Sequence, residues 1–424
     1  MGDRVIMHID MNAFYASVAQ HLDPGLRGKA VAVAGDPERR SGIILAKSRE
    51  AKACGVKTAE AIWQAKQKCP ELIVVPPDYA AYKRYSRLAR MIYYGYTDLV
   101  EPFGLDESWI DVTGSLQLFG GDAMLVAREI SERVKSELGL TVSIGVSWNK
   151  VFAKLGSDTD PGDGIVSITR GNFRDVAWPM AASEMIYVGP ATMRKLRSAG
   201  YETIGDLAHA GDYFLKRRFG KIGAMLRAFA RGEDASPVKV MDPSKADVDY
   251  VVKGIGNGLT APHDLECDSD VKALVWLLSE SVAQRLRESR MRCRTVSVGA
   301  RFARDLSGYS RQRTLRTPTC LTRDVANVAM GLLRSNQPLD KEHALRAVHV
   351  RVTNLVPMDV PVQCELFGDA EETGRLERLD LAIDALRGRF GNTCVKRAVE
   401  LTDEVMSGLD IKRDNTVHPV GFLR

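Results

Sequence analysis

The sequence predicts an α+β fold divided among several domains, and its first half predicts a ferredoxin-like βαββαβ sheet. The chain has 424 residues, too many for one hydrophobic core, which indicates roughly three or four domains. Between residues 5 and 147, apolar runs and longer helical stretches follow in the order strand, helix, two strands, helix, strand. Residues 250–357 alternate helices with strands again and predict a second α/β domain.

Each element of the first half is bounded by its own local pattern. The weak alternation of Val5–Asp10 predicts the first strand, and residues 14–21 predict a helix directly after it. Next come two short strands (28–34 and 42–46), the turn between them (36–40) and a helix (48–56) that ends at Gly55. The expected sheet is completed by a long helix (79–96), a hairpin of two strands (101–113), a second helix (121–138) and a last strand (142–147).

Two adjacent carboxylates, Asp106 and Glu107, lie between the two strands of the predicted hairpin. Successive strand residues point to opposite faces, so both acids serve one site only if the backbone bends, and Gly104 and Ser108 favour such a bend. A third acid, Asp10, ends the first strand. Three oxygen ligands without a Cys/His cluster suit Mg²⁺ and predict a two-metal phosphoryl-transfer site. Taken singly, Asp106 and Glu107 would also suit a solvated turn, and Asp10 a helix N-cap.

Three stretches in a fixed order resemble catalytic motifs of one enzyme family. They are residues 8–18 (HIDMNAFYASV), 104–113 (GLDESWIDVT) and 142–158 (VSIGVSWNKVFAKLGSD), and they resemble the Y-family translesion DNA polymerases of the DinB type found in bacteria. The resemblance extends from about Val5 to about Gly391. It implies a ferredoxin-like palm, small fingers, a helical thumb with a helix-hairpin-helix and an α/β little finger. It also implies DNA-directed translesion synthesis by nucleotidyl transfer without proofreading.

The resemblance assigns roles to the acids and to one aromatic residue. Asp10 and Asp106 bridge two Mg²⁺ ions, Glu107 holds the ion at the primer, and the backbone carbonyl of Met11 is a further ligand; Mn²⁺ is a possible substitute. Tyr15, five residues after Asp10, matches the steric gate that excludes a ribonucleotide 2′-hydroxyl. Without the motif, a single tyrosine of this kind would be read as a core aromatic.

Four further residues are expected to contact the incoming nucleotide. Asn12 and Phe14 lie at the start of the first helix, whose N-terminal amides suit a triphosphate. Arg49 and Lys52 share one face of the next helix, at positions where typical relatives carry Tyr and Arg. Positive charge is retained, although lysine lacks the bidentate grip of a guanidinium group. An exposed basic helix face is the alternative reading.

The sequence departs from the family pattern near residue 161. Relatives have a lysine followed by a proline where Pro161 and Gly162 stand, and that lysine normally meets the triphosphate. Lys150 and Lys154 are the candidates to replace it.

DNA contacts are expected in two later regions. Residues 188–207 resemble a helix-hairpin-helix, in which Gly189 and the helix amides after it would hold a DNA phosphate. Residues 250–357 contain 17 lysines and arginines against 10 aspartates and glutamates, an excess of seven positive charges, while the whole chain carries only +5. This local excess indicates a polyanion partner, although a solvated surface is the alternative. The arginines expected to track phosphates are Arg301, Arg311, Arg313 and Arg316.

A short peptide near the end of the chain suggests a protein partner. Gln363, Leu366 and Phe367 match the Q-x-x-L-F motif by which bacterial polymerases bind the sliding clamp. An adjacent Leu and Phe need a burial partner, which is either the clamp or the chain's own little finger. The expected domain limits are palm (1–21 and 79–171), fingers (22–78), thumb (172–237), linker (238–249), little finger (250–357) and a C-terminal tail with the clamp motif (358–424).

The composition of the chain predicts where the protein works in the cell and which partners it binds. No apolar run of about 18 residues and no signal peptide is seen, so a cytoplasmic protein without a membrane partner is expected. The seven cysteines are scattered without a C-x-x-C pair, which predicts reduced residues, no disulfide framework and no zinc site. The expected partners are primer-template DNA, deoxynucleoside triphosphates and the clamp. The protein is expected to be a monomer. A catalytically silent accessory protein that binds DNA or the clamp is the alternative.

Overall fold

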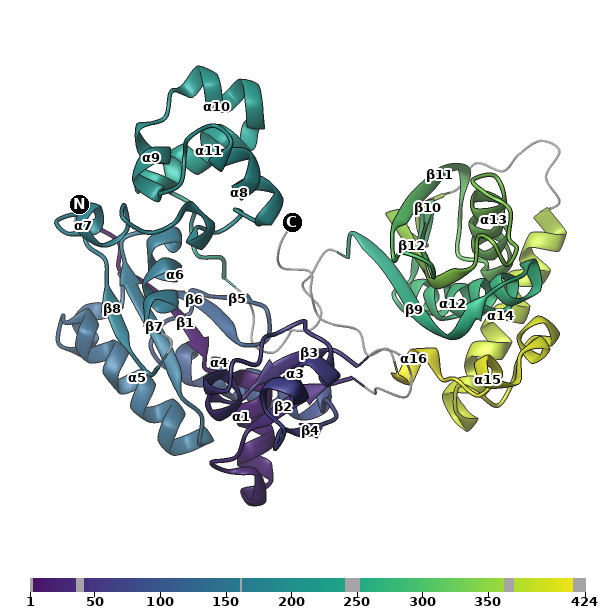
Figure 1. Ribbon diagram of the computed structural model, residues 1–424, viewed down its shortest axis with the longest axis horizontal. Helices are drawn as coiled ribbons and strands as arrows, with labels where there is room; N and C mark the ends of the chain where they lie inside the picture. The colour runs from purple at the N-terminus through teal and green to yellow at the C-terminus, as the bar shows by residue number, and fades with distance from the viewer. Residues whose placement is uncertain (1–2, 36–41, 161, 241–251, 362–369, 415–424) are drawn as a thin grey trace. The chain divides into compact units, whose positions relative to one another are not determined.

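The computed structural model describes residues 3–35, 42–160, 162–240, 252–361 and 370–414 (Figure 1). The described residues form two compact units, one made of residues 3–35 and 43–240 and the other mainly of residues 252–414, and both contain helices and sheets. Within the described ranges, no helix is both long and apolar enough to cross a membrane. The finer domain limits stay predictions.

A five-stranded sheet forms the centre of the first unit, with strand order β5-β6-β1-β7-β8. The strands are β1 (Ile6–Met11), β5 (Val100–Phe103), β6 (Glu107–Asp111), β7 (Val142–Ser147) and β8 (Ile165–Ser167). The helices packed on them are α1 (Phe14–Leu22), α4 (Tyr79–Tyr94), α5 (Ala123–Leu138) and α6 (Lys150–Thr159). The first four strands, with α4 and α5, have the antiparallel βαββαβ connection that the sequence predicted. β8 pairs in parallel with β7 and was not predicted.

Alternation along β1 separates the two faces of this sheet. Met7 and Ile9 are buried in a core that includes residues of α1, α4 and α5. His8 and Asp10 are the alternate residues, so they point to the opposite face. That face is the one covered by α6, because Ile6 of the same parity packs against Ala153. β1 therefore directs Asp10 toward α6.

Two glycines allow α6 to lie directly against the sheet. A Cβ atom on Gly145 of β7 would lie 1.8 Å from the carbonyl oxygen of Ala153. A Cβ on Gly156 of α6 would lie 3.1 Å from the Cα of Gly145. A side chain at either position would push the helix away from the strand. The close contact holds Lys154 and Ser157 of α6 next to the end of β1.

A smaller three-stranded sheet in the same unit has its own core. Its strands are β2 (Val31–Ala34), β3 (Ile44–Lys47) and β4 (Ile73–Val75), in the order β3-β2-β4, with the helices α2 (Arg49–Ala53) and α3 (Ile62–Lys68) beside them. Ser48 caps α2 by accepting a hydrogen bond from the amide of Ala51, and Gly55 follows with a φ of 84°. α3 and β4 were not predicted. The expected turn at 36–40 lies outside the described residues.

Short helices make up the last part of the first unit. They are α7 (Phe173–Val176), α8 (Pro190–Arg197), α9 (Ile204–His209), α10 (Asp212–Phe219) and α11 (Lys221–Ala230), with a 3-10 turn at 182–184 (η3). Two other 3-10 turns lie earlier in the unit, at 24–26 (η1) and 116–119 (η2). α8 begins with Pro190 directly after Gly189, and α9 begins with a capping box between Thr203 and Asp206. These helices share a hydrophobic core with Trp148 and with apolar residues of α6.

The second unit is a four-stranded sheet with helices on one face, in the order β11-β10-β12-β9. Its elements are β9 (Gly254–Leu265), α12 (Asp268–Glu288), β10 (Met291–Phe302), β11 (Gly308–Thr319), α13 (Thr322–Arg334) and β12 (Leu345–Pro357). Val296, Val298 and Val350 are buried together with apolar residues of α12 and α13. The opposite face of the sheet carries the alternate residues of each strand.

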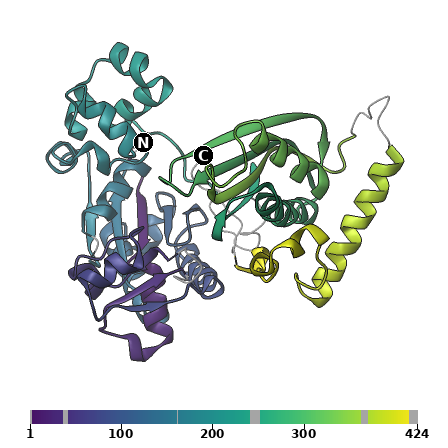
Figure 2. The same ribbon diagram turned by 45° about the vertical axis from the view of Figure 1, so that its right-hand side comes forward.

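The described part of the predicted tail is folded onto this unit (Figure 2). It contains α14 (Ala370–Phe390), a 3-10 turn at 398–402 (η4), α15 (Glu404–Ser407) and α16 (Ile411–Asp414). Arg287 of α12 lies 3.1 Å from Asp380 and 2.6 Å from Asp384 of α14, and all three side chains are largely buried. Arg387 of α14 reaches Glu280 of α12 at 2.6 Å. The predicted helix at 376–390 thus begins earlier, at Ala370, and it is anchored by a buried ionic network.

Candidate active site

The three predicted acids meet where β1 faces the hairpin of β5 and β6. Asp10 lies directly opposite Glu107 in the strand register. The amide of Met11 donates a hydrogen bond to the carbonyl of Asp106 at 3.1 Å. Asp106 is in the turn before β6, where Gly104 has a φ of 92°. The turn therefore supplies the backbone bend that two adjacent acids need to serve one site.

The electrostatics of these acids suit a divalent cation. Burial raises the pKa of Asp10 to about 8, and the charges of Glu107 and Asp106 add to the increase. Burial and Glu107 raise the pKa of Asp106 to about 6. Three partly buried carboxylates repel one another unless protons or a cation neutralise them. All the donors are hard oxygens, so the residues present fit Mg²⁺ or Mn²⁺.

Positive and neutral groups from α6 and β1 surround Glu107. The Nζ of Lys154 lies 3.1 Å from the Oε2 of Glu107 and 3.4 Å from the Oδ2 of Asp158. His8 is fully buried, its Nε2 lies 3.4 Å from the same Oε2, and burial lowers its pKa. Its Nδ1 is 2.7 Å from the hydroxyl of Ser157. Burial raises the pKa of Glu107, but His8 and Lys154 outweigh it, so the net pKa is lowered and Glu107 is anionic.

The two lysines considered as replacements at the triphosphate differ in position. Lys150 forms an ion pair with Glu101 at 2.8 Å and lies over the ring of Trp109. Lys154 instead forms an ion pair with Glu107, one of the three predicted acids. The departure at Pro161 lies outside the described residues. His8 was missed in the sequence, where its only signal was a polar residue in an apolar strand.

Tyr15 and its neighbours line the α1 side of the acids. The ring of Tyr15 stacks on Tyr82 with centroids 4.1 Å apart and planes at 10°. Burial, and then the charge of Asp106, raise the pKa of Tyr15. Tyr15 is therefore partly packed and also close to the acids, so the gate and core readings are compatible. Phe14 is buried in the core, which leaves its backbone amide as the group available to a nucleotide.

Asn12 and Met11 are held by β7. The side chain of Asn12 donates to the hydroxyl of Thr141 at 3.2 Å and accepts a hydrogen bond from Ser143 at 2.9 Å. The side chain of Met11 is buried, so only its backbone carbonyl is suited to the predicted ligand role.

The basic residues of α2 lie beside the same strand end. Arg49 donates to the hydroxyl of Thr141 at 3.3 Å, and Arg49 and Lys52 are both exposed. Lys47 of β3 was missed in the sequence. Burial lowers its pKa and the positive charge of Lys52 lowers it further, while the carboxylate of Glu60 acts in the opposite direction. An anion is the natural partner for this arrangement.

The four arginines predicted to track phosphates do not share one face of the second unit. Arg311 and Arg313 lie opposite two buried valines of β10, so they belong to the helix-covered side, at the edge strand β11. Arg301 belongs to the opposite, open face. Arg316 lies within an irregular stretch of the pairing of β10 with β11, between Thr314 and Thr319. The strand register decides which face each residue takes, and the role of the four arginines at phosphates stays a prediction.

Two residues of the open face were missed in the sequence. Arg351 and His349 of β12 have the same parity as the open-face residues of β10. A Cβ on Gly256 would lie 3.1 Å from the Cβ of Arg351, and one on Gly258 would lie 2.7 Å from the Cβ of His349. The glycines of β9 thus leave room for these side chains. Strict alternation in residues 347–352 was the available signal.

Gly189 is exposed at the start of α8, as a phosphate contact would require. The clamp residues Gln363, Leu366 and Phe367 lie outside the described residues.

Comparisons with known proteins agree over both units. A family model for the impB/mucB/samB family matches residues 9–158, and a model for the C-terminal domain of that family matches residues 252–366. The chain is 46% identical over 400 residues to DNA polymerase IV of Acetivibrio thermocellus, covering 94% of this chain and 98% of that protein. It is 36% identical over 402 residues to DNA polymerase IV 1 of Bacillus subtilis, covering 95% and 94%.

A solved structure supports the fold independently. A Y-family DNA polymerase chimera superposes with a TM-score of 0.71 over 83% of this chain and 99% of the chimera, at 23% identity. The predicted α+β multidomain fold is therefore confirmed. From the family matches, the extent of the identity and the order of its motifs, the chain belongs to the Y-family DNA polymerases of the DinB type.

Proposed function

We infer that this chain is a DNA-directed DNA polymerase that performs translesion synthesis. It acts on primer-template DNA with deoxynucleoside triphosphates, and it depends on divalent metal ions. The observation that carries the inference is the meeting of three partly buried carboxylates at the end of β1. An accessory protein without catalysis would have no use for acids that repel one another and cost stability.

We propose two Mg²⁺ ions, with Mn²⁺ as a substitute, held by Asp10, Asp106, Glu107 and the carbonyl of Met11. When bound, the ions activate the primer 3′-oxygen and neutralise the triphosphate during in-line transfer. Lys154 balances the charge of Glu107 and holds it in position.

The substrate-facing residues have distinct proposed tasks. Arg49 and Lys52 attract the triphosphate, while Asn12 and the amide of Phe14 position it. Tyr15 lies under the sugar and excludes a 2′-hydroxyl. Support comes from the exposure of the two basic residues and from the nearness of Tyr15 to Asp106.

The DNA duplex is proposed to contact both units. Gly189 and the first amides of α8 suit a phosphate. Arg301, joined by Arg351 and His349, suits phosphates on the open face of the second sheet, while Arg311, Arg313 and Arg316 would reach DNA only at the edge strand.

We further propose that the enzyme works as a cytoplasmic monomer bound to the sliding clamp. Gln363, Leu366 and Phe367 are the proposed docking residues, and the sequence motif alone supports them.

Primer extension in Mg²⁺ tests the catalytic assignment. Asp106→Asn and Glu107→Gln should each reduce extension by at least about 100-fold, because each removes a charged ligand. DNA binding, measured by fluorescence anisotropy, should change little. Glu137→Gln on the exposed side of α5 is the matched control. Near-normal extension by both site variants would overturn the assignment.

A further inference from the structure

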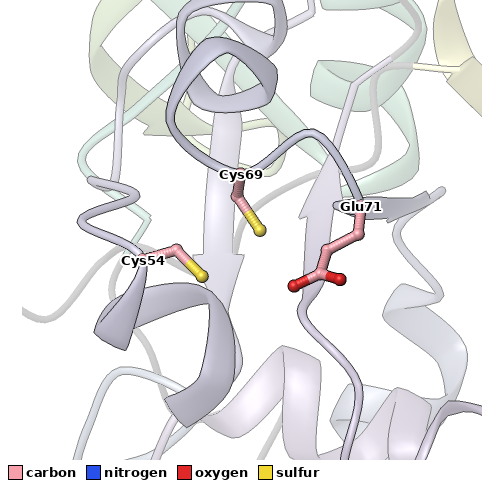
Figure 3. A group of neighbouring side chains, drawn as sticks. All are labelled: Cys54, Cys69 and Glu71. Carbon is pink, nitrogen blue, oxygen red and sulfur yellow. The ribbon is translucent and has the colours of Figure 1, made fainter.

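Three side chains from different elements of the small sheet region lie close together. Cys54 ends α2, Cys69 ends α3, and Glu71 lies in the turn before β4. Figure 3 shows the two sulfur atoms and the carboxylate pointing toward one another. One ligand atom from each residue lies within 4.8 Å of the other two. The fold thus gathers two thiols and a carboxylate at one point.

The group is buried on one side and exposed to solvent on the other. Cys69 is 1% exposed and packs in the core of the small sheet, whereas Cys54 and Glu71 are exposed. Within the described ranges, no lysine or arginine forms an ion pair with Glu71. The neighbouring Lys68 instead pairs with Glu60, at 2.5 Å. The group therefore has a buried wall, an open side and no positive partner of its own.

Each residue has an ordinary structural explanation when it is considered alone, but the three residues together do not. A buried cysteine behaves as a small apolar residue, and an exposed glutamate is ordinary on a surface. Burial raises the pKa of Cys69 to about 11, and Cys54 and Glu71 both act in the same direction. A cation bound by two thiolates and a carboxylate would neutralise the repulsion among them.

We propose that Cys54, Cys69 and Glu71 form a site for a thiophilic divalent cation, with Zn²⁺ as the ion that fits best. Zinc binds sulfur at about 2.3 Å and carboxylate oxygen at about 2.0–2.2 Å, so tetrahedral ligand atoms lie about 3.5–3.8 Å apart. Small side-chain rotations would close the observed group to that size. The fourth position faces solvent and takes water. Binding releases the thiol protons to solvent, and thiolate ligands select against Mg²⁺.

The site goes beyond polymerase activity and has a structural consequence. A bound ion would join the ends of α2 and α3. α2 carries Arg49 and Lys52, so the ion would hold in place the helix that presents these charges. The acids at β1 are not part of this site.

Metal titration of the full-length protein tests the proposal. The protein is kept reduced and in excess Mg²⁺, so that the oxygen ligands at β1 are satisfied, and Co²⁺ is added as a spectroscopic probe. One Co²⁺ per chain should bind with a near-ultraviolet thiolate-to-cobalt absorption band, and Zn²⁺ should displace it. Cys54→Ser and Glu71→Gln should each weaken binding at least about tenfold.

Control variants separate this site from other thiols. Cys54 is exposed, so Cys54→Ser does not disturb a core, and Cys69→Ala, checked for folding by circular dichroism, is the second variant. Cys394→Ser changes another exposed cysteine and should bind Co²⁺ like the parent. Co²⁺ binding without the thiolate band, or parental affinity in Cys54→Ser, would overturn the proposal. Primer extension by all these variants should stay normal in Mg²⁺, so failure here is distinct from failure of the polymerase assignment.

Discussion

Asp10 should make the metal-free enzyme less stable as the pH rises, and Asp10→Asn should remove that effect. Burial, aided by Glu107 and Asp106, raises the pKa of Asp10 from 3.8 to about 8. The folded chain therefore binds this proton more tightly than the unfolded chain does. Stability is lost as the pH rises from about 4, and the loss is complete above about pH 8.

The size of the effect follows from the pKa change. A rise from 3.8 to about 8 corresponds to about 6 kcal/mol, at ~1.4 kcal/mol for each tenfold change in proton affinity. This is an upper limit, because the three acids titrate together and the protein relaxes around a buried charge. At least about 1 kcal/mol should remain, which raises the unfolding midpoint of a unit this size by about 2–4 °C.

Thermal unfolding in EDTA measures the prediction. Asp10→Asn should unfold at a higher temperature than the parent at about pH 8.5, with a smaller gain at about pH 5.5. Glu132→Gln, an exposed residue of α5, controls for the loss of one charge. Added Mn²⁺ should stabilise the parent more than the variant. An equal gain at both pH values, or none, would refute the electrostatic argument.

Four further predictions concern separate parts of the molecule. Tyr15→Ala should raise ribonucleotide use relative to deoxyribonucleotide in single-nucleotide extension; an unchanged sugar preference would leave Tyr15 as a core aromatic only. Arg301→Ala should lower the log–log salt slope of DNA binding by up to about 0.9, and an unchanged slope would remove it from the phosphate contacts. Replacing Leu366 and Phe367 with Ala should abolish any stimulation by added clamp without affecting extension on a short primer, whereas a lower unfolding temperature would show that the pair packs in its own core. Arg287→Ala leaves the largely buried Asp384 without its ion-pair partner and Asp380 with Arg397 alone, and it should destabilise the second unit by about 3–5 kcal/mol in denaturant unfolding; a loss below about 1 kcal/mol would contradict the network.

Local patterns predicted the long elements well and the short ones poorly. α4, α5 and β7 have clear periodicity and β1 alternates weakly, and all four were expected close to their observed limits. β4 and β8 have three residues each, too few to show alternation. α6 was not predicted either, although Lys150, Lys154 and Asp158 recur every four residues and give it a polar face.

Some residues of the candidate site could be predicted from the sequence and others could not. Asp10, Asp106 and Glu107 were found because they stand within a motif and beside strand ends. The roles of His8 and Lys47 depend on tertiary packing, which a single sequence does not display. The face taken by Arg311 was missed because it depends on strand register across a sheet.

The anchoring of α14 limits how far a docked partner can stand from the second unit. Twelve residues separate the end of β12 at Pro357 from the start of α14 at Ala370, and both ends belong to the same folded body. A chain tethered twice can extend only half its contour, about 20 Å at 3.3–3.6 Å per residue. A protein that binds this segment would therefore be held close to the second unit by two connections, unlike a protein that binds a free chain end. Its orientation would then be set largely by where the two tethers emerge.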